Sequence, residues 1–381
     1  MIRQWFSTHR SLVASLASGT VIAALIAGVA IVSTGYTAQR LDLGDGSVWV
    51  PNNQQQAIGR ANTEVLELNT VVPTTGSDLE VLQSGSTVLL VDLTEARIEI
   101  VDPATSEVTE SIALPPDNPQ VYLAGDRVVI FEGGTGRTWI MDLEALISFD
   151  SQAPSTLDLG ADALVSVDPA GLLFGWAPAA GMLYRVNSAV SDAVVSTATL
   201  DLGTDTAGLT LSSVAGSWVF WNSADRIVTT ERGGSTDLSG LVPSGAGSFV
   251  QQAATSGSRA LISHPGGLVA VPLDGGSSVE LATGTSGLAA APFALEGCEY
   301  AAWTSGQSWR RCGSDREGSI TTLTAMPSTA RLGFVANGTR AVLNDGRSGS
   351  TWAVQREGQL IDNWDDLIVP DDEEPFRARG L

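Results

Sequence analysis

Few side chains in this chain are of the types that carry out catalysis. The chain has two cysteines, Cys298 and Cys312, and two histidines, His9 and His264, which is too few for a zinc site or a Cys/His couple. All 20 basic residues are arginine, so a Schiff-base lysine, a P-loop lysine and a lysine general base are excluded. We therefore expect no catalytic residue, no metal site and no cofactor.

The two cysteines are placed so that they could bond to each other. Cys298 and Cys312 bracket the segment EYAAWTSGQSWRR, and a hairpin turning at Ser305-Gly306 would bring them opposite each other on paired strands. Outside the cytoplasm this geometry favours a disulfide, which contributes about 3 kcal/mol in the chain-entropy model. Two buried free thiols are the alternative.

Aspartates are the remaining candidates for a ligand site. Asp45, Asp126 and Asp168 stand just before or at the start of strands that we assign to the inside of a repeat. Loops at that position rim the central opening of a propeller, where they could hold a cation or a sugar. Aspartate also favours turns on its own account, so solvated turn residues are the alternative interpretation.

The charge balance limits the partners that the chain can bind. The chain has 42 acidic residues against 20 basic ones, and its formal net charge is −22. Such a surface repels phosphate backbones and anionic lipid headgroups. We therefore expect no nucleic-acid partner.

The elements that must position these residues are short β-strands in a repeat of about forty residues. After residue 40, runs rich in Val, Leu, Ile, Trp and Thr alternate with Gly, Asp, Asn and Ser. Four strands fill such a period, so the sequence predicts an all-β β-propeller of about eight four-stranded blades over residues 36–368. A ring of seven blades is the alternative if the first unit is irregular. The eight runs follow these glycines, which are 39 to 46 residues apart: Gly46, Gly85, Gly125, Gly171, Gly216, Gly257, Gly297 and Gly338.

We assign the run after each glycine to the innermost strand of its blade. In the clearest unit, which begins at Ser86, the four strands are then STVLLVD, ARIEIVD, EVTESIAL and QVYLAG. By this assignment the last unit has only three strands. Residues 37–43 are predicted to supply its outermost strand, beside residues 358–364, and so to close the ring.

Two other features have structural explanations that we favour. Asn337-Gly338-Thr339 matches a glycosylation sequon, but it also matches an Asn-Gly turn between strands. Repeated tryptophans favour packing between blades over a ligand platform. They occur in the strands assigned as innermost and in the strands that follow: Trp49, Trp176, Trp221 and Trp303, then Trp139, Trp309 and Trp352.

The N-terminal region predicts a membrane anchor. Residues 11–33 contain no charged residue, and Arg3 and Arg10 precede them. We expect a transmembrane helix over residues 11–33, residues 1–10 in the cytoplasm and the propeller outside the cell. A cleaved signal peptide is the alternative, although the apolar stretch is long for one and no small-x-small cleavage site follows it. Residues 369–381 form an acidic tail.

Several segments resemble one known family over nearly the whole chain. MIRQWFSTHRSLV, STGYTAQRLDLGDGSVWVPNNQQQAIGRANTEVLELNTVV and LNDGRSGSTWAVQREGQLIDNWDDLIVP resemble the N-terminal portion of large actinobacterial membrane-anchored proteins with fibronectin type III or Ig-like repeats. The resemblance implies a cell-envelope surface or adhesion component in which a propeller-like region precedes an acidic linker and a repeat array. Here the linker begins as PDDEEP and continues as FRARGL, so the chain looks like the anchor and propeller of this family without its repeat array. The family has no catalytic motif to transfer.

Two functions of different classes follow as expectations. The first is a binding or scaffold module of the cell envelope, held at the membrane by its N-terminal helix and contacting an envelope polymer or a protein. The alternative is a carbohydrate-active hydrolase of the envelope. That activity needs two acidic side chains that converge in the propeller channel at the spacing glycoside hydrolysis demands.

Overall fold

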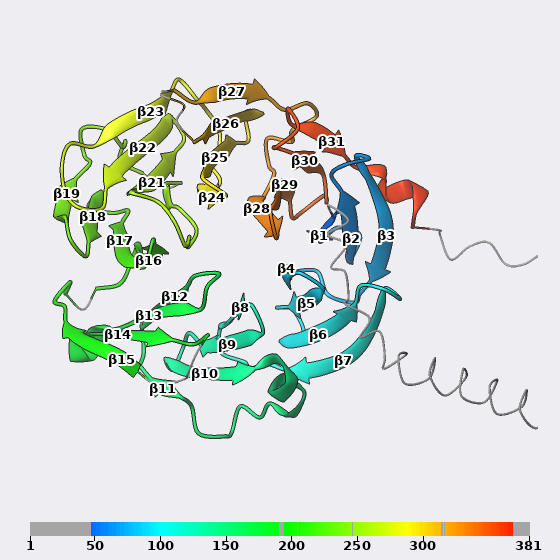
Figure 1. Cartoon of the computed structure of the whole chain (residues 1–381), viewed down its shortest axis with the longest axis horizontal. Coiled ribbons are helices and arrows are strands. Elements are labelled where there is room, and N and C mark those ends of the chain that lie inside the picture. The colour runs from blue at the N-terminus through cyan, green and yellow to red at the C-terminus, as the bar shows by residue number, and fades with distance from the viewer. Residues whose placement is uncertain are drawn as a thin grey trace, which may run out of the picture. The chain divides into compact units, whose positions relative to one another are not determined.

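The computed structural model describes residues 47–368, except residues 190–193, 204, 246, 314 and 316. These residues form eight antiparallel β-sheets arranged as the blades of a ring (Figure 1). The prediction of an all-β propeller with eight blades is therefore confirmed. The predicted transmembrane helix, residues 36–46 and the acidic tail lie outside the described residues. Among the residues that are described, no helix has the length and apolar character needed to cross a membrane.

The blades follow one another in chain order. The first has three strands, β1 (Ser47–Asn52), β2 (Ala57–Asn62) and β3 (Glu67–Pro73). The second contains β4 (Leu79–Ser84), β5 (Thr87–Asp92), β6 (Arg97–Asp102) and β7 (Glu107–Ala113). The third contains β8 (Pro119–Ala124), β9 (Arg127–Glu132), β10 (Arg137–Asp142) and β11 (Leu157–Asp158), and the fourth contains β12 (Leu164–Val167), β13 (Leu172–Ala177), β14 (Met182–Asn187) and β15 (Val194–Thr199).

The second half of the ring repeats this arrangement. Its blades contain β16 (Leu209–Val214), β17 (Ser217–Asn222), β18 (Ile227–Thr230) and β19 (Gly234–Asp237), then β20 (Phe249–Val250), β21 (Arg259–His264), β22 (Gly267–Pro272) and β23 (Val279–Thr283). The last two contain β24 (Phe293–Leu295), β25 (Cys298–Trp303), β26 (Gln307–Cys312) and β27 (Ser319–Thr322), then β28 (Leu332–Asn337), β29 (Arg340–Asp345), β30 (Thr351–Ala353) and β31 (Gln359–Ile361). Three short 3-10 helices join them: η1 (Leu143–Ser148), η2 (Pro178–Ala180) and η3 (Asn363–Asp366).

In the seven blades with four strands, the strand that follows the marker glycine is the second strand, so our assignment of it as the innermost strand was wrong. Gly85, for example, turns the chain from β4 into β5, and QVYLAG is the first strand of the third blade. The second strands are buried almost throughout, as in β5 and β9. A strand covered on both faces is a continuous apolar run, which is why these strands dominate the sequence pattern.

The last blade contains four strands of its own, so the prediction that it lacks a fourth strand was wrong. Its sheet order is β28-β29-β30-β31, and β31 occupies the outermost position. Residues 37–43, which we predicted to complete this blade, lie outside the described residues. The blade with three described strands is the first one.

In the first blade, β1 stands in the position of a second strand. Trp49 on β1 is buried like Trp176, Trp221 and Trp303, which lie on the second strands of other blades. No described strand lies inside β1, and β28 contacts β4 there across the first blade. Eight sheets therefore surround only seven innermost strands in the part of the chain that is described.

Side-chain amides pair with the inner edge of β1 and with the neighbouring blades. The Trp49 N–H donates to Gln83 Oε1 at 2.9 Å, and Gln83 Nε2 donates to the Trp49 carbonyl at 3.0 Å. Asn337 pairs with both backbone groups of Gly85 in the same way, at 2.9 and 3.1 Å. Gln83 thus satisfies a donor and an acceptor of β1 that a neighbouring strand would otherwise satisfy, and Asn337 ties the β4–β5 turn of the second blade to the last blade. Asn337 also begins the β28–β29 turn, as we expected when we favoured a turn over a glycosylation site.

The connections between second and third strands repeat one local structure. Asn52, Asp92 and Asn222 end their strands, and the side-chain Oδ1 of each accepts a hydrogen bond from the turn that follows. Asx side chains favour this arrangement because they replace a backbone acceptor. The turn then closes through a left-handed residue, such as Ala96 with φ 49°. Four-residue turns of this kind help to fix the register between the second and third strands of a blade.

The tryptophans pack between blades, as predicted. Trp176 is fully buried, and its ring lies edge-on to Phe220 of the next blade with centroids 5.5 Å apart. Its indole N–H donates to the Leu200 carbonyl at 3.2 Å. Replacing a tryptophan buried in this way by alanine typically costs about 3–5 kcal/mol.

The disulfide is also confirmed. Cys298 and Cys312 lie directly opposite each other on β25 and β26, with Cα atoms 4.0 Å apart, and their sulfur atoms are bonded. The hairpin that joins these strands turns at Thr304–Gly306, as the spacing of the cysteines required.

Candidate functional site

A cavity of about 1150 Å³ lies at the centre of the ring. Its wall is built from residues of the seven innermost strands, β4, β8, β12, β16, β20, β24 and β28. Each of these strands pairs with the second strand of its own sheet, and no strand of another sheet pairs with its other edge among the described residues. Three of these inner edges are met locally: the Ser213 carbonyl of β16 accepts from the Ala254 N–H, and the carbonyls of Val165 and Phe334 accept from the side chains of Tyr122 and Gln252. Such edges present backbone N–H and C=O groups that can bind an extended chain.

The channel has two different mouths. At the hairpin mouth the innermost strands turn into the second strands, and Gly125, Pro169 and Gly338 line it. At the strand-start mouth the innermost strands begin, and Asn53 and Arg331 line it. Apolar side chains and uncharged polar groups make up most of the wall between them.

Three of the described residues that line the cavity carry charge: Glu80, Arg331 and Glu296. Glu80 is the second residue of β4, near the strand-start mouth, and Glu296 lies in the β24–β25 turn at the hairpin mouth. Gly85 in the β4–β5 turn is the equivalent of Glu296 in its own blade. Glu80 lies five residues before Gly85, which is roughly 16 Å along an extended strand. The two carboxylates therefore lie toward opposite ends of the channel.

The Glu80 side chain is exposed to the channel but is surrounded at a distance by the channel wall. Protein surrounds the channel on all sides, and this burial raises the pKa of Glu80, with Asp78 raising it further and Arg331 opposing the change. Tyr122 on β8 also lines this part of the wall, and its hydroxyl lies 2.7 Å from Gln120 Oε1. Burial, and then the charge of Glu80, raise the pKa of Tyr122 well above its ordinary value.

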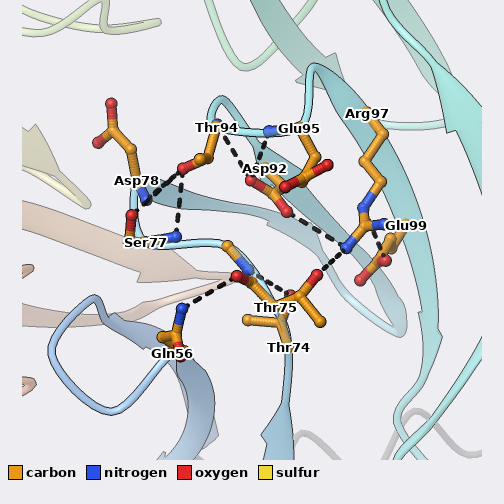
Figure 2. A network of polar contacts seen from close by, with 11 residues as sticks. Gln56, Thr74, Thr75, Ser77, Asp78, Asp92, Thr94, Glu95, Arg97 and Glu99 are labelled. Atoms are coloured by element: carbon orange, nitrogen blue, oxygen red, sulfur yellow. Dashed lines mark hydrogen bonds and ion pairs between the residues drawn. The ribbon is translucent and has the colours of Figure 1, made fainter.

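A polar network holds the connection that leads into β4 (Figure 2). Thr94 Oγ1 accepts hydrogen bonds from the backbone N–H groups of Ser77 and Asp78 at 3.2 and 3.1 Å. The Leu93 N–H donates to the Asp78 carbonyl at 2.9 Å. These contacts with the β5–β6 turn fix where the strand begins, and therefore where Glu80 enters the channel.

Asp92 and Arg97 form the second part of this network, as Figure 2 shows. Arg97 Nη2 lies 3.3 Å from Asp92 Oδ2 and donates to Thr75 Oγ1 at 2.7 Å. The Asp92 side chain is completely buried, and Gly76 packs so closely on its carboxylate that a Cβ at position 76 would lie 2.3 Å from it. Only glycine fits between this carboxylate and the connecting chain.

Arg331 joins the last blade to the second at the strand-start mouth. Its guanidinium lies 2.7 Å from Asp78 Oδ1, and its backbone N–H donates to Asp345 Oδ1 at 2.7 Å. Arg331 is thus the ion-pair partner of Asp78, and Glu80 has no ion pair or hydrogen bond of its own among the described residues.

Of the aspartates singled out in the sequence, the two that the structure describes, Asp126 and Asp168, do not line the channel. Asp45 lies outside the described residues. Asp126 is exposed in the β8–β9 turn. Asp168 is 3% exposed in the β12–β13 turn, where its Oδ1 accepts hydrogen bonds from the N–H groups of Ala170 and Leu172 at 3.0 and 2.9 Å. The described residues also include no group of three or more His, Cys, Asp or Glu side chains placed to hold a metal ion.

The sequence interpretation missed Glu80 because it took the strand after each glycine as innermost, which leaves the strand before Gly85 away from the channel. The available signal was a single acidic residue inside an otherwise apolar and uncharged run between Asp78 and Gly85.

Comparisons with known proteins support the fold. No family model matches the chain, and no curated protein matches its sequence. Among solved structures, BamB from Moraxella catarrhalis is 13% identical, with 81% of this chain and 93% of that chain covered and a TM-score of 0.51. Apo AztD from Citrobacter koseri is 11% identical, with 83% and 94% covered and a TM-score of 0.53. At these identities the likeness concerns the fold alone.

Proposed function

We propose that this chain is a protein-binding scaffold module of the cell envelope and not an enzyme, and that its channel receives an extended segment of the partner. The observation that carries this proposal is the cavity of about 1150 Å³ walled by seven innermost strands whose inner edges have no partner strand along most of their length. Its volume slightly exceeds the usual range for small-molecule sites, about 300–1,000 Å³. A main chain that enters it would find free backbone donors and acceptors on several of these strands.

The location and the family are part of the same proposal. Residues 11–33 anchor the chain in the membrane, the propeller lies outside the cell, and the chain corresponds to the anchor and propeller of the actinobacterial repeat proteins. The uncharged stretch preceded by Arg3 and Arg10 supports the anchor, and the Cys298–Cys312 disulfide agrees with an oxidising compartment.

A protein partner agrees with the wall better than a carbohydrate does. Exposed aromatic rings commonly stack on sugars, but no tryptophan lines the cavity, and none among the described residues is exposed. Of the aromatic side chains that do line it, Phe334 is 5% exposed, and Phe293 stacks on it with centroids 5.8 Å apart. These rings cover each other and leave little face for a sugar.

The carbohydrate-hydrolase alternative has less support. Glycoside hydrolysis uses two carboxyl groups about 5–10 Å apart on either side of the scissile bond. Glu80 and Glu296 stand toward opposite mouths of the channel, and Asp78, close to Glu80 in sequence, is bound to Arg331. The wall therefore offers one free carboxylate at each end and no pair.

A plug in the channel tests the proposal. Gly333 on β28 lines the cavity, and a Cβ at this position would meet open space. Gly333→Trp should therefore place a bulky ring in the channel and obstruct it without disturbing the blades. Gly240 also has open space around it and lies outside the cavity wall, so Gly240→Trp is the matched control.

Peptides from a displayed random 12-residue library would be selected on the purified full chain and their affinities measured by fluorescence anisotropy. We expect Gly333→Trp to abolish binding and Gly240→Trp to leave it unchanged. Equal binding to both variants would place the site outside the channel and contradict the proposal. Cleavage of purified peptidoglycan by the wild-type chain, lost in Glu80→Gln, would instead support the hydrolase.

A further inference from the structure

We infer that the channel recognises an extended polypeptide segment carrying an arginine or lysine, and that Glu80 is the residue that selects this basic side chain. The inference rests on the proposed function and adds the chemistry of the partner. It names one residue of the wall as the determinant of specificity.

Glu80 differs from the other carboxylates around it in having no partner. Asp78 is bound to Arg331 at 2.7 Å, and Asp92 is bound by Arg97 and by the N–H groups of its own turn. Glu80 lines the cavity, is exposed to it and makes no ion pair with a described residue. Its carboxylate is therefore available to a group that enters the channel.

The environment of Glu80 favours a cation over other ligands. The channel wall removes part of the solvent from the carboxylate, and Asp78 adds a second negative charge nearby. Both effects raise its pKa, which means that the ionised form is under-stabilised. An arginine or lysine placed against Glu80 would supply the missing stabilisation as a charge-assisted hydrogen bond.

Arg331 does not already fill this role. It is close enough to lower the pKa of Glu80, but its guanidinium is bound to Asp78 and is 64% exposed at the mouth. The Tyr122 hydroxyl lies on the neighbouring strand, against Gln120. The charged and titratable groups that face Glu80 are thus Asp78, Arg331 and Tyr122, and none of them binds it.

The rest of the wall agrees with an extended segment. Free strand edges can bind its backbone, and apolar wall residues such as Leu82 and Leu211 can receive its apolar side chains. The formal net charge of −22 attracts a basic partner and accelerates its encounter. The simplest segment that fits the strand edges, the apolar wall and the acidic charge is an extended one with a single cationic residue among apolar and hydroxyl-bearing neighbours.

The probe is the hexapeptide Val-Thr-Val-Arg-Val-Thr-amide with fluorescein attached to its N-terminal amine, compared with the same peptide carrying citrulline in place of arginine. Citrulline keeps the shape and most of the hydrogen bonds but removes the charge. Affinities would be measured on the full chain, on Glu80→Gln and on Glu296→Gln. Glu296 lines the same cavity at the other mouth, which makes Glu296→Gln the matched control.

The wild-type chain should bind the arginine peptide about tenfold more tightly than the citrulline peptide, the discrimination of one charge-assisted pair. Glu80→Gln should remove this difference, and Glu296→Gln should retain it. The preference of the wild-type chain should weaken as pH falls through the raised pKa of Glu80, at a higher pH than for an ordinary glutamate. In Glu80→Gln this dependence should disappear.

Two results would overturn the inference and would have different consequences. Equal affinity of the wild-type chain for both peptides, with binding still blocked by Gly333→Trp, would refute the charge selection and leave the channel-binding function intact. Failure of the wild-type chain to bind either peptide would also refute it, and the library selection would then decide separately whether the proposed function holds.

Discussion

Gly76 and Asp92 show how single residues set the position of the candidate site. Asp92 ends β5, and its Oδ1 accepts the N–H groups of Thr94 and Glu95 at 3.0 and 3.1 Å. Its buried carboxylate packs on Gly76, in the connection that leads to Asp78 and Glu80. One turn residue therefore organises its own hairpin and also the start of a channel strand.

Gly76→Ala is expected to destabilise the fold, because its Cβ would lie 2.3 Å from the Asp92 carboxylate and the connection must move. Overpacking of a buried site typically costs about 1–3 kcal/mol, measurable as a lower Tm. Gly333→Ala is the control, because its Cβ meets no atom within 4 Å. An unchanged Tm in Gly76→Ala would show that the connection is not held by Asp92.

The two kinds of site residue were unequally predictable from the sequence. Cys298 and Cys312 are related by one local hairpin, so their spacing was sufficient to predict the bond. Glu80 acquires its environment from Asp78, Arg331 and Tyr122, and Arg331 comes from the far end of the chain. No local pattern contains that information, because it arises only when the ring closes.

At the scale of elements, the inner edge of β1 is the unusual feature. Other second strands pair with a first strand on their inner side, whereas β1 is met by side-chain amides from β4 and β28. Gln83 supplies both an acceptor and a donor to Trp49, and Asn337 reaches the Ser47 carbonyl at 3.5 Å. These amides connect three consecutive blades around the ring.

Gln83→Leu should weaken this connection, because it leaves the N–H and carbonyl of Trp49 without partners in a buried strand. Each unsatisfied buried group costs about 1–3 kcal/mol. Hydrogen exchange at the Trp49 amide should accelerate and the Tm should fall. Gln359→Leu, at an exposed position of β31, is the control. Equal protection of Trp49 in both variants would rule out Gln83 as the group that satisfies β1.

The sequence predicted the period and number of blades but displaced the assignment of strands by one. Second strands such as TVLLVD are apolar throughout, because both faces are buried. First strands such as LEVLQS border the channel and are only partly buried, so their pattern is weaker. The error carried over to the predicted site, because Asp126 and Asp168 were placed relative to the wrong strand.

At the scale of the whole molecule, the ring combines a channel wall that carries few charges with a strongly acidic chain. Regular glycine spacing predicted the ring, and the likeness to other propellers in solved structures agrees with it. The manner of closure could not be predicted, because it depends on contacts such as Arg331 with Asp78, more than 250 residues apart in the chain. These contacts bring the free carboxylate of Glu80 to the mouth of the channel.

The central claim is that a protein segment enters this channel, and photo-crosslinking in intact cells tests it most directly. Thr210 on β16 lines the cavity and is exposed to it, whereas Thr197 on β15 is exposed on the outermost strand of another blade. A benzoylphenylalanine at position 210 should give an adduct whose crosslinked peptide contains an arginine or lysine within a few residues, and position 197 should give none. Adducts from position 197 alone, or a carbohydrate adduct from position 210, would contradict the account.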